Sequence, residues 1–282
     1  MAFEQVVVAR SVFLAATFVL FGAALLPHYS RVGAQQPILP RPGRAILASV
    51  ATIAALVWFA AIVEAAAQDG EGSLETAHAI LFETSFGPVW LTRLGALALL
   101  VVASFGGRDL PVLALSGAVV ACEGWTGHAA AWGALASLNQ ALHALAGAAW
   151  IGALVALMLL LRRASRQPGH VAGACRALSS FSGAGVALVV VIAATGAVNT
   201  WMVLKGLPDP SRLYDRVLIA KVGLFLAMVA VAATNRFVLV PAMQTSGKLR
   251  APTLAVAVEQ VLGVLVLVDV GALGLLSPAS GR

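Results

Sequence analysis

The chain has 282 residues, of which 60% are hydrophobic and only 11% are charged, and its mean hydropathy is +0.94. Soluble domains carry about 25% charged residues, so this composition excludes a soluble enzyme, a disordered chain and a nucleic-acid-binding domain. The net charge of +6 resides in short segments between apolar runs, which is typical of membrane topology rather than of an acidic partner. We expect an integral membrane protein without enzymatic activity.

Apolar runs of spanning length recur along the whole chain. A helix that crosses the hydrocarbon core needs about 20 predominantly apolar residues, and transmembrane β-strands would alternate polar and apolar positions. The pattern predicts an all-α polytopic bundle, a single transmembrane domain over 1–282, with about eight helices. The runs are 5–26, 44–67, 88–105, 110–124, 136–161, 178–203, 213–240 and 254–276. The fourth is short, and the first could alternatively be a signal peptide, although it lacks early basic residues and a clear cleavage site.

Basic residues set the expected orientation, because cytoplasmic loops are enriched in Lys and Arg. Eleven fall in one set of loops: Arg31, Arg41, Arg44, Arg108, Arg162, Arg163, Arg166, Arg176, Arg236, Lys248 and Arg250. The alternate set holds Lys205, Arg212, Arg216 and Arg282. This bias predicts that both termini are external, on the periplasmic side.

Four charged residues near or within the last two runs need partners, because an unpaired charge in the bilayer is costly. In the antiparallel hairpin formed by the last two runs, two residues that lie at the same depth have residue numbers whose sum is nearly constant. The register predicts two interhelical ion pairs, Arg236–Glu259 and Lys221–Asp269. Such pairs most often hold helices in register, and a role along an ion path is the alternative.

Several metal-ligating residue types fall at the external level of the predicted bundle. His143 lies two turns into the fifth run, whereas His78 and His128 lie in external connections. Imidazole and soft sulfur suit copper or zinc. The candidate metal ligands are His128, His143, His78, Glu123, Cys122 and Met202. Each of these residues also has an interpretation that involves no metal, namely a solvated histidine, a helix cap, or a packed histidine, cysteine or methionine.

Motifs between residues 84 and 278 resemble the copper resistance protein D (CopD) family. They begin with Thr84-Ser85-Phe86-Gly87, Trp90, Arg93, Gly127-His128-Ala129, Leu142-His143-Ala144-Leu145-Ala146, Trp150-Ile151-Gly152, Phe181-Ser182 and Thr195-Gly196. They continue with Tyr214-Asp215-Arg216-Val217-Leu218-Ile219-Ala220-Lys221, Asn235-Arg236, Pro241, Glu259-Gln260-Val261-Leu262-Gly263 and Leu276-Ser277-Pro278. The resemblance covers 84–278 and is strongest over 125–241.

This resemblance implies an eight-helix inner-membrane protein that handles copper, with a copper ion, Cu(I) or Cu(II), held by His128 and His143. It also implies a separate periplasmic copper-binding partner similar to CopC. Cys122 and Glu123 lie outside the family pattern. We expect contact with the lipid bilayer, and no nucleic acid or nucleotide partner.

Three functions remain open from the sequence. The first is copper transport, and the second is a membrane cytochrome in which histidines on facing helices hold haem b. The third is a non-transporting copper chaperone or assembly partner. The cytochrome requires a second histidine within a span, and only His143 is predicted to lie inside one.

Overall fold

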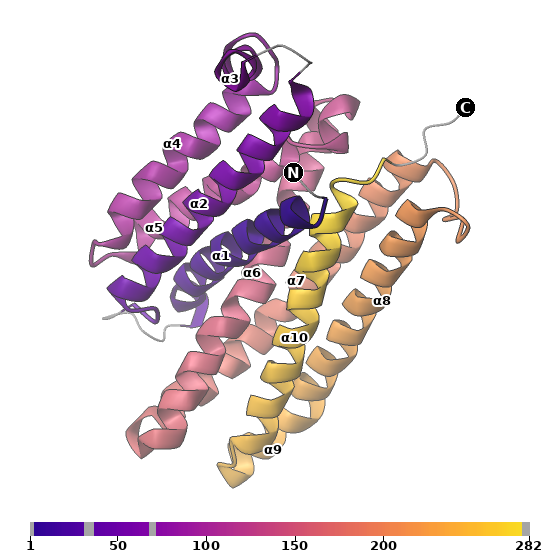
Figure 1. The fold of residues 1–282 in the computed structure, drawn as a ribbon. Coiled ribbons are helices and arrows are strands. Elements are labelled where there is room, and N and C mark those ends of the chain that lie inside the picture. The colour runs from indigo at the N-terminus through magenta and orange to yellow at the C-terminus, as the bar shows by residue number, and fades with distance from the viewer. Residues whose placement is uncertain (1–2, 31–36, 68–71, 278–282) are drawn as a thin grey trace.

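A computed structural model describes the chain except for residues 1–2, 31–36, 68–71 and 278–282; the side chains of 128, 129 and 168 also lie outside the description. Its described parts are helical and contain no strand (Figure 1). The first elements are α1 (Phe3–Ser30), α2 (Arg41–Ala66), α3 (Ser73–Phe82), α4 (Gly87–Ser104), α5 (Asp109–Ala121), η1 (Cys122–Gly124) and η2 (His128–Trp132). The remaining ones are α6 (Ala134–Arg166), η3 (Pro168–His170), α7 (Val171–Leu204), α8 (Leu213–Thr234), the π-helix η4 (Asn235–Leu239), α9 (Val240–Ser246) and α10 (Arg250–Leu273).

The predicted polytopic helical bundle is confirmed. Seven segments among the described residues are long and apolar enough to cross a membrane, and α8, η4 and α9 together form one of them. The fourth predicted run, 110–124, is the one that is not among these seven; it corresponds to α5, whose 13 residues extend about 20 Å, too short to cross the hydrocarbon core alone. Even so, the start of α1 packs on the end of α10, where Gly271 lies against Val7 and Ser11. The first and last helices therefore begin and end on the same side of the membrane, which requires an even number of crossings. With seven long spans, α5 together with η1 is the eighth crossing.

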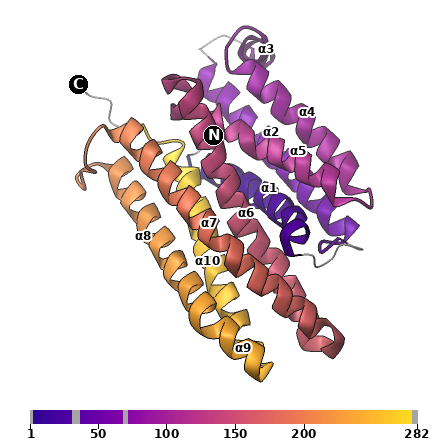
Figure 2. The same cartoon turned by 180° about the vertical axis from the view of Figure 1, so that it is seen from behind.

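The helices form two groups that meet along α1 and α6 (Figures 1 and 2). The first group contains α2, α4 and α5 packed around α1, and the second contains α7, α8 and α10 beside α6. Gly22 of α1 and Gly152 of α6 face each other at the contact, and a Cβ on Gly152 would overlap the Phe18 carbonyl. Small residues at this crossing let the two backbones approach closely, as in other membrane bundles.

The outward faces of α7, α8 and α10 are apolar and exposed. Val190 is 61% exposed, Leu226 58% and Val261 61%, although they lie in the middle of spanning helices. Because water is absent from the hydrocarbon core, these side chains contact lipid in the membrane.

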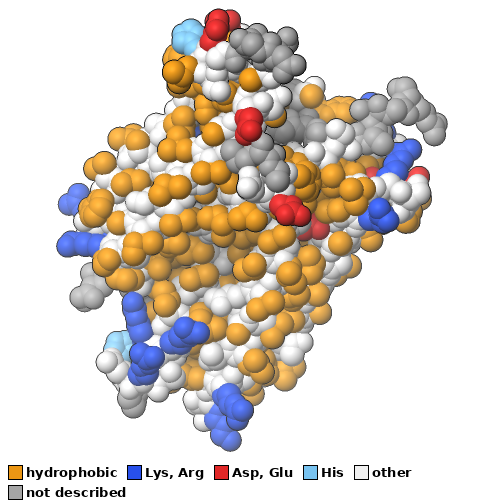
Figure 3. All heavy atoms as spheres, in the orientation of Figure 1, with side chains coloured by type: hydrophobic (Ala, Val, Ile, Leu, Met, Phe, Trp, Pro, Cys, Tyr) orange, Lys and Arg blue, Asp and Glu red, His pale blue; other side chains and the backbone are white. Residues whose placement is uncertain are grey.

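Charged side chains lie mainly at the two ends of the bundle (Figure 3). The end that holds α9 and the α6–α7 connection shows mostly Lys and Arg, whereas acidic side chains gather towards the α3 end. A smaller basic group at the α7–α8 connection accompanies acidic residues. This separation follows the loop assignment of the sequence; of the residues used for it, Arg31 and Arg282 lie outside the described parts.

Candidate functional site

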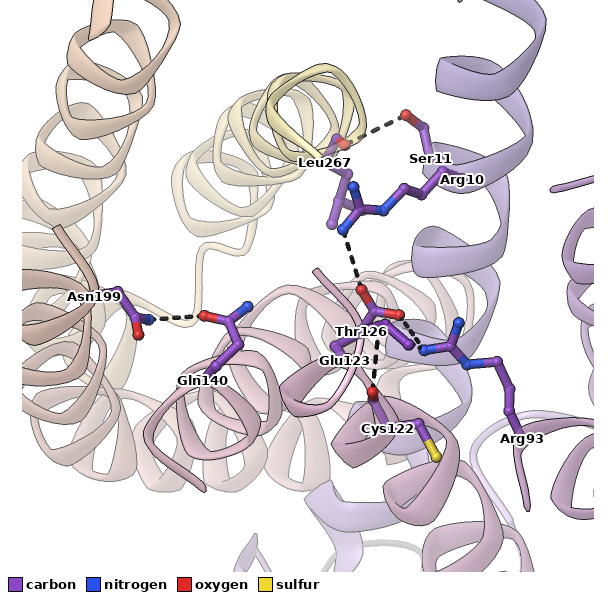
Figure 4. A network of polar contacts seen from close by, with 9 residues as sticks. All are labelled: Arg10, Ser11, Arg93, Cys122, Glu123, Thr126, Gln140, Asn199 and Leu267. Carbon is purple, nitrogen blue, oxygen red and sulfur yellow. Dashed lines mark hydrogen bonds and ion pairs between the residues drawn. The ribbon is translucent and has the colours of Figure 1, made fainter. Parts of the chain in front are cut away.

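A buried ion-pair cluster joins the first helix group to η1 (Figure 4). The Glu123 carboxylate accepts a hydrogen bond from Arg93 Nη2 at 2.7 Å and another from Arg10 Nη2 at 3.3 Å. Arg93 Nη2 also donates to Thr126 Oγ1 at 3.1 Å, and Thr126 donates to the Cys122 carbonyl at 3.3 Å. Arg93 is fully buried and Glu123 is 3% exposed. One carboxylate from η1 thus holds α1 and α4 together.

Aromatic rings surround the two guanidinium groups. The Arg93 guanidinium lies 4.8 Å from the Trp90 ring centroid and 5.0 Å from that of Trp58, and Arg10 lies 5.1 Å from Trp58. Cation–π contacts of this kind are strongest where the cation is desolvated. The aromatic faces therefore stabilise the positive charge that a single carboxylate leaves uncompensated.

His143 of α6 faces α7. Its Nδ1 is 2.9 Å from Thr195 Oγ1, and its ring lies against Gly196, where a Cβ would sit 3.3 Å from the ring. The Thr195 hydroxyl donates to the Val191 carbonyl at 2.5 Å, so it is available as an acceptor for an Nδ1–H group. This arrangement selects the tautomer in which Nε2 carries the free lone pair.

The amide side chains of Asn139, Gln140 and Asn199 form a polar layer about one turn from His143. Asn139 Nδ2 donates to the Thr195 carbonyl at 3.0 Å and to Asn199 Oδ1 at 2.8 Å. Asn199 Nδ2 in turn donates to Gln140 Oε1 at 2.7 Å, as Figure 4 shows. The layer holds α6 to α7 around the histidine.

Lys221 of α8 lies next to this layer. It interacts electrostatically with His143, Asp269 and Arg10. The Lys221 charge acts electrostatically on Asp269, but no direct ion pair joins the two side chains in the part of the chain that the structure describes. Lys221 and Asp269 are thus neighbours, in the register that the sequence predicts, without a direct contact.

The predicted Arg236–Glu259 pair is wrong. Arg236 donates to the Ser182 carbonyl of α7 at 2.5 Å, whereas Glu259 accepts from Trp150 Nε1 of α6 at 3.4 Å. Both residues fall where the hairpin register puts them along the axis. However, the π-helix that begins at Asn235 adds a residue to the turn. η4 packs against both α10 and α7, and Arg236 is directed to α7.

The candidate copper ligands do not all come together. Cys122 lies in η1 and interacts with the Arg93 guanidinium, and both Glu123 oxygens already accept from arginines. A metal ion at Glu123 would have to displace one of them. His78, on the short helix α3, is exposed and 3.7 Å from Glu83 Oε1. Met202 is half-buried, two turns beyond Thr195 on α7.

His128 begins η2, but its side chain lies outside the described residues. η2 itself packs against α6 and α7, the helices that carry His143 and Thr195. Among the described side chains, no group of three or more His, Cys, Asp or Glu is placed to hold a metal ion. The described histidines His28, His78 and His170 are exposed, so none of them faces His143 across the bundle as haem ligation would require.

Sequence reasoning did not identify Arg10 and Arg93 as partners of Glu123. The signal was present, because two arginines within predicted spans need buried carboxylates. Glu123 is the acidic residue at the end of the fourth run. Its partners were missed because it was interpreted as a metal ligand.

A further family motif residue, Asp215, has a structural role in the α7–α8 connection. Its buried carboxylate accepts from the Asp209 backbone N–H at 2.6 Å and so fixes the loop before α8. The Ser211 backbone N–H holds the pKa of the exposed Asp209 below its usual range by hydrogen bonding to the charged form.

Comparisons with known proteins agree with the motifs. Residues 1–138 match the family described as Copper resistance protein D-like, N-terminal domain, and 175–273 match Copper resistance protein D. Copper resistance protein D of Pseudomonas syringae pv. tomato is 32% identical, over 92% of this chain and 92% of that protein. Inner membrane protein YebZ of Escherichia coli (strain K12) is 30% identical over 70% of this chain and 71% of its own length.

A more distant relative is Copper transport protein CutJ of Bacillus subtilis (strain 168), 26% identical over 92% of this chain and 50% of its own length. None of these three names denotes an enzyme, and no solved structure matches. With its spanning helices, its two family matches and these relatives, the chain is a multi-pass inner-membrane protein that belongs to the copper resistance protein D family.

Proposed function

We propose that the protein accepts copper ions at the periplasmic face of the inner membrane and moves them into the bundle through a site built around His143. The observation that carries the proposal is the position of this imidazole at the contact of α6 with α7, with Nδ1 held by Thr195. The relatives support the copper part, because two are named for copper resistance or copper transport.

The Thr195 contact suits a metal ligand. Metal-binding histidines commonly donate one ring N–H to a fixed acceptor, which orients the ring and leaves the other nitrogen for the metal. Thr195 Oγ1 is such an acceptor, since its own proton is directed to the Val191 carbonyl. Nε2 of His143 is then the coordinating atom.

Further ligands would come from the elements that pack around the first turns of α6. η2 carries His128, which the family resemblance pairs with His143, and η1 carries Cys122. Met202 lies on the same helix as Thr195. Imidazole, thiol and thioether groups are the ligands that copper prefers over hard cations. A separate periplasmic copper-binding protein similar to CopC would deliver the ion to this end.

Glu123 and His78 have a weaker claim to this inner site. Glu123 is held by Arg10 and Arg93, and His78 lies on the exposed helix α3. We assign Glu123 to the ion-pair cluster that holds η1 in place. Glu123 would then affect copper binding only indirectly, by fixing the position of Cys122 in the same element. His78 is left as a surface residue.

The test measures copper bound per purified protein and copper uptake by proteoliposomes for the wild type, His143→Ala and His128→Ala. The matched control is His170→Ala, because His170 is exposed at the opposite end of the bundle. We expect the first two variants to lose copper binding and uptake and the control to retain both. Binding that survives both His143→Ala and His128→Ala would overturn the site.

Uptake distinguishes a transporter from a chaperone. If the wild type binds copper through His143 but empty and protein-containing vesicles take up copper equally, the protein accepts copper without transporting it. The absorption spectrum of the same samples detects haem by its Soret band, which would contradict the copper site.

A further inference from the structure

Among the described residues, Glu259 is a buried carboxyl group without a cationic partner. Its side chain is fully buried on α10, and its Oε2 accepts a long hydrogen bond of 3.4 Å from Trp150 Nε1. Its Oε1 is buried and has no hydrogen-bond donor among the described residues. An ionised carboxylate with so little compensation is very costly inside a membrane bundle.

A second unpartnered oxygen belongs to the neighbouring residue Asn235. Asn235 is 4% exposed, and its side chain lies near the Glu259 carboxyl group and interacts with it. Its Oδ1 is also buried without a donor in the described parts of the chain. Among the described residues, these two neighbouring side chains therefore each have an acceptor oxygen without a donor, and one added hydrogen could serve both.

In the parts of the chain that the structure describes, the surrounding elements supply no charge that pairs with Glu259. Arg236 of η4 points away and donates to Ser182 of α7. On α10 and α8, Asp269 and Lys221 lie towards the other end, with Asp269 ten residues or about 15 Å along the helix. α6 contributes the neutral Trp150, and α1 has no charged residue between Arg10 and His28.

We propose that Glu259 and Asn235 form a proton-binding site in the interior of the membrane, with Glu259 carrying a transferable proton. A proton that adds to Oε1 forms an O–H bond and neutralises the carboxylate. The same O–H group then donates to the Asn235 amide oxygen, so both vacant acceptors are satisfied. Release of the proton to water restores the carboxylate.

A proton suits the pair better than a metal ion does. Hard cations such as Mg²⁺ and Ca²⁺ take six or more oxygen ligands, and copper prefers sulfur and imidazole. The site offers one carboxyl group and one amide, packed against Trp150. The π-helix that places Asn235 here is also the kind of irregularity that often marks functional positions in helices. This inference does not depend on the copper site, because its evidence lies at a different level of the bundle.

Infrared spectroscopy of the protein in lipid tests the proposal directly, since a protonated carboxyl group has a C=O stretching band that an ionised one lacks. We expect wild-type protein labelled with ¹³C-glutamate to show such a band at neutral pH, shifted by the label. Glu259→Gln should abolish it. Glu83→Gln, the same chemical change on an exposed residue, should leave it unchanged.

Two further variants examine the contacts. Asn235→Ala should move the band to higher wavenumber because the acceptor is lost, and Arg236→Gln should leave it in place. A wild-type spectrum without a labelled glutamate band would overturn the proposal even if Glu259→Gln failed to fold. A band that persists in folded Glu259→Gln, or disappears in Arg236→Gln, would also overturn it.

Discussion

Glu123 and Glu259 are both buried glutamates in one helix bundle, yet their surroundings are opposite. Glu123 binds two arginines, and aromatic rings cover the charge that remains. Glu259 has an indole and an amide as its neighbours and keeps one oxygen without a donor. The difference indicates that the first carboxylate holds helices together through ion pairs, whereas the second lacks cationic partners among the described residues, as the proposed proton site requires.

The two glutamates also belong to different helix groups. Glu123 joins α1, α4 and η1, so its ion pairs lock the first group. Glu259 lies at the contact of α10 with α6 and η4, on the side of the bundle that also holds His143, Lys221 and Asp269. We therefore expect variants near Glu123 to change stability and variants in the second group to change binding and proton chemistry.

The largest expected effect is that of Glu123→Gln on stability. It leaves two buried guanidinium groups without a carboxylate, and loss of one partner of a buried ion pair costs about 3–5 kcal/mol. Unfolding of the purified protein in lipid or detergent micelles measures the change. Glu83→Gln on the exposed α3 is the control, and a loss below about 1 kcal/mol would contradict the locking role.

The next effect concerns copper affinity. Thr195→Val keeps the shape of the side chain but removes the oxygen that accepts from His143 Nδ1. Loss of such a supporting contact typically lowers metal affinity about 10–100-fold. Copper titration of the purified protein measures it, with Thr234→Val, an exposed helical threonine, as the control. If Thr195→Val and Thr234→Val bound copper with equal affinity, the proposed role of His143 in copper binding would be contradicted.

Glu259→Gln should alter stability much less than Glu123→Gln does. Glutamine resembles a protonated glutamate in size and charge, so the change amounts to about one hydrogen bond, on the order of 1 kcal/mol or less. The same unfolding measurement applies. If the two substitutions lowered stability by the same several kcal/mol, the contrast between an ion-paired glutamate and one without a cationic partner would be contradicted.

The smallest effect is expected for His78→Ala. His78 is exposed on α3, and surface substitutions usually change stability by no more than about 0.5 kcal/mol. Copper bound per protein should be unchanged as well. Loss of copper from this variant alone would move the proposed site from α6 and α7 to the α3 end.

The register of the final hairpin illustrates how far sequence reasoning reaches. Counting residues from the turn predicts that Arg236 is level with Glu259 and Lys221 with Asp269. In the structure Glu259 interacts with Asn235, the residue before Arg236, and Asp269 interacts with Lys221. The partner was nevertheless wrong for Glu259. A single extra residue in the π-helix changes the direction of a side chain around the helix axis without changing its depth.

Hydropathy and length by themselves determined the helical class, the spanning segments and the membrane location, because burial in lipid depends on local composition. The motifs determined the family. Only the tertiary structure decided which polar groups are paired, since that choice depends on the direction of side chains from helices far apart in sequence. Arg10 and Arg93 meet at Glu123 for this reason, and Glu259 is left with Asn235.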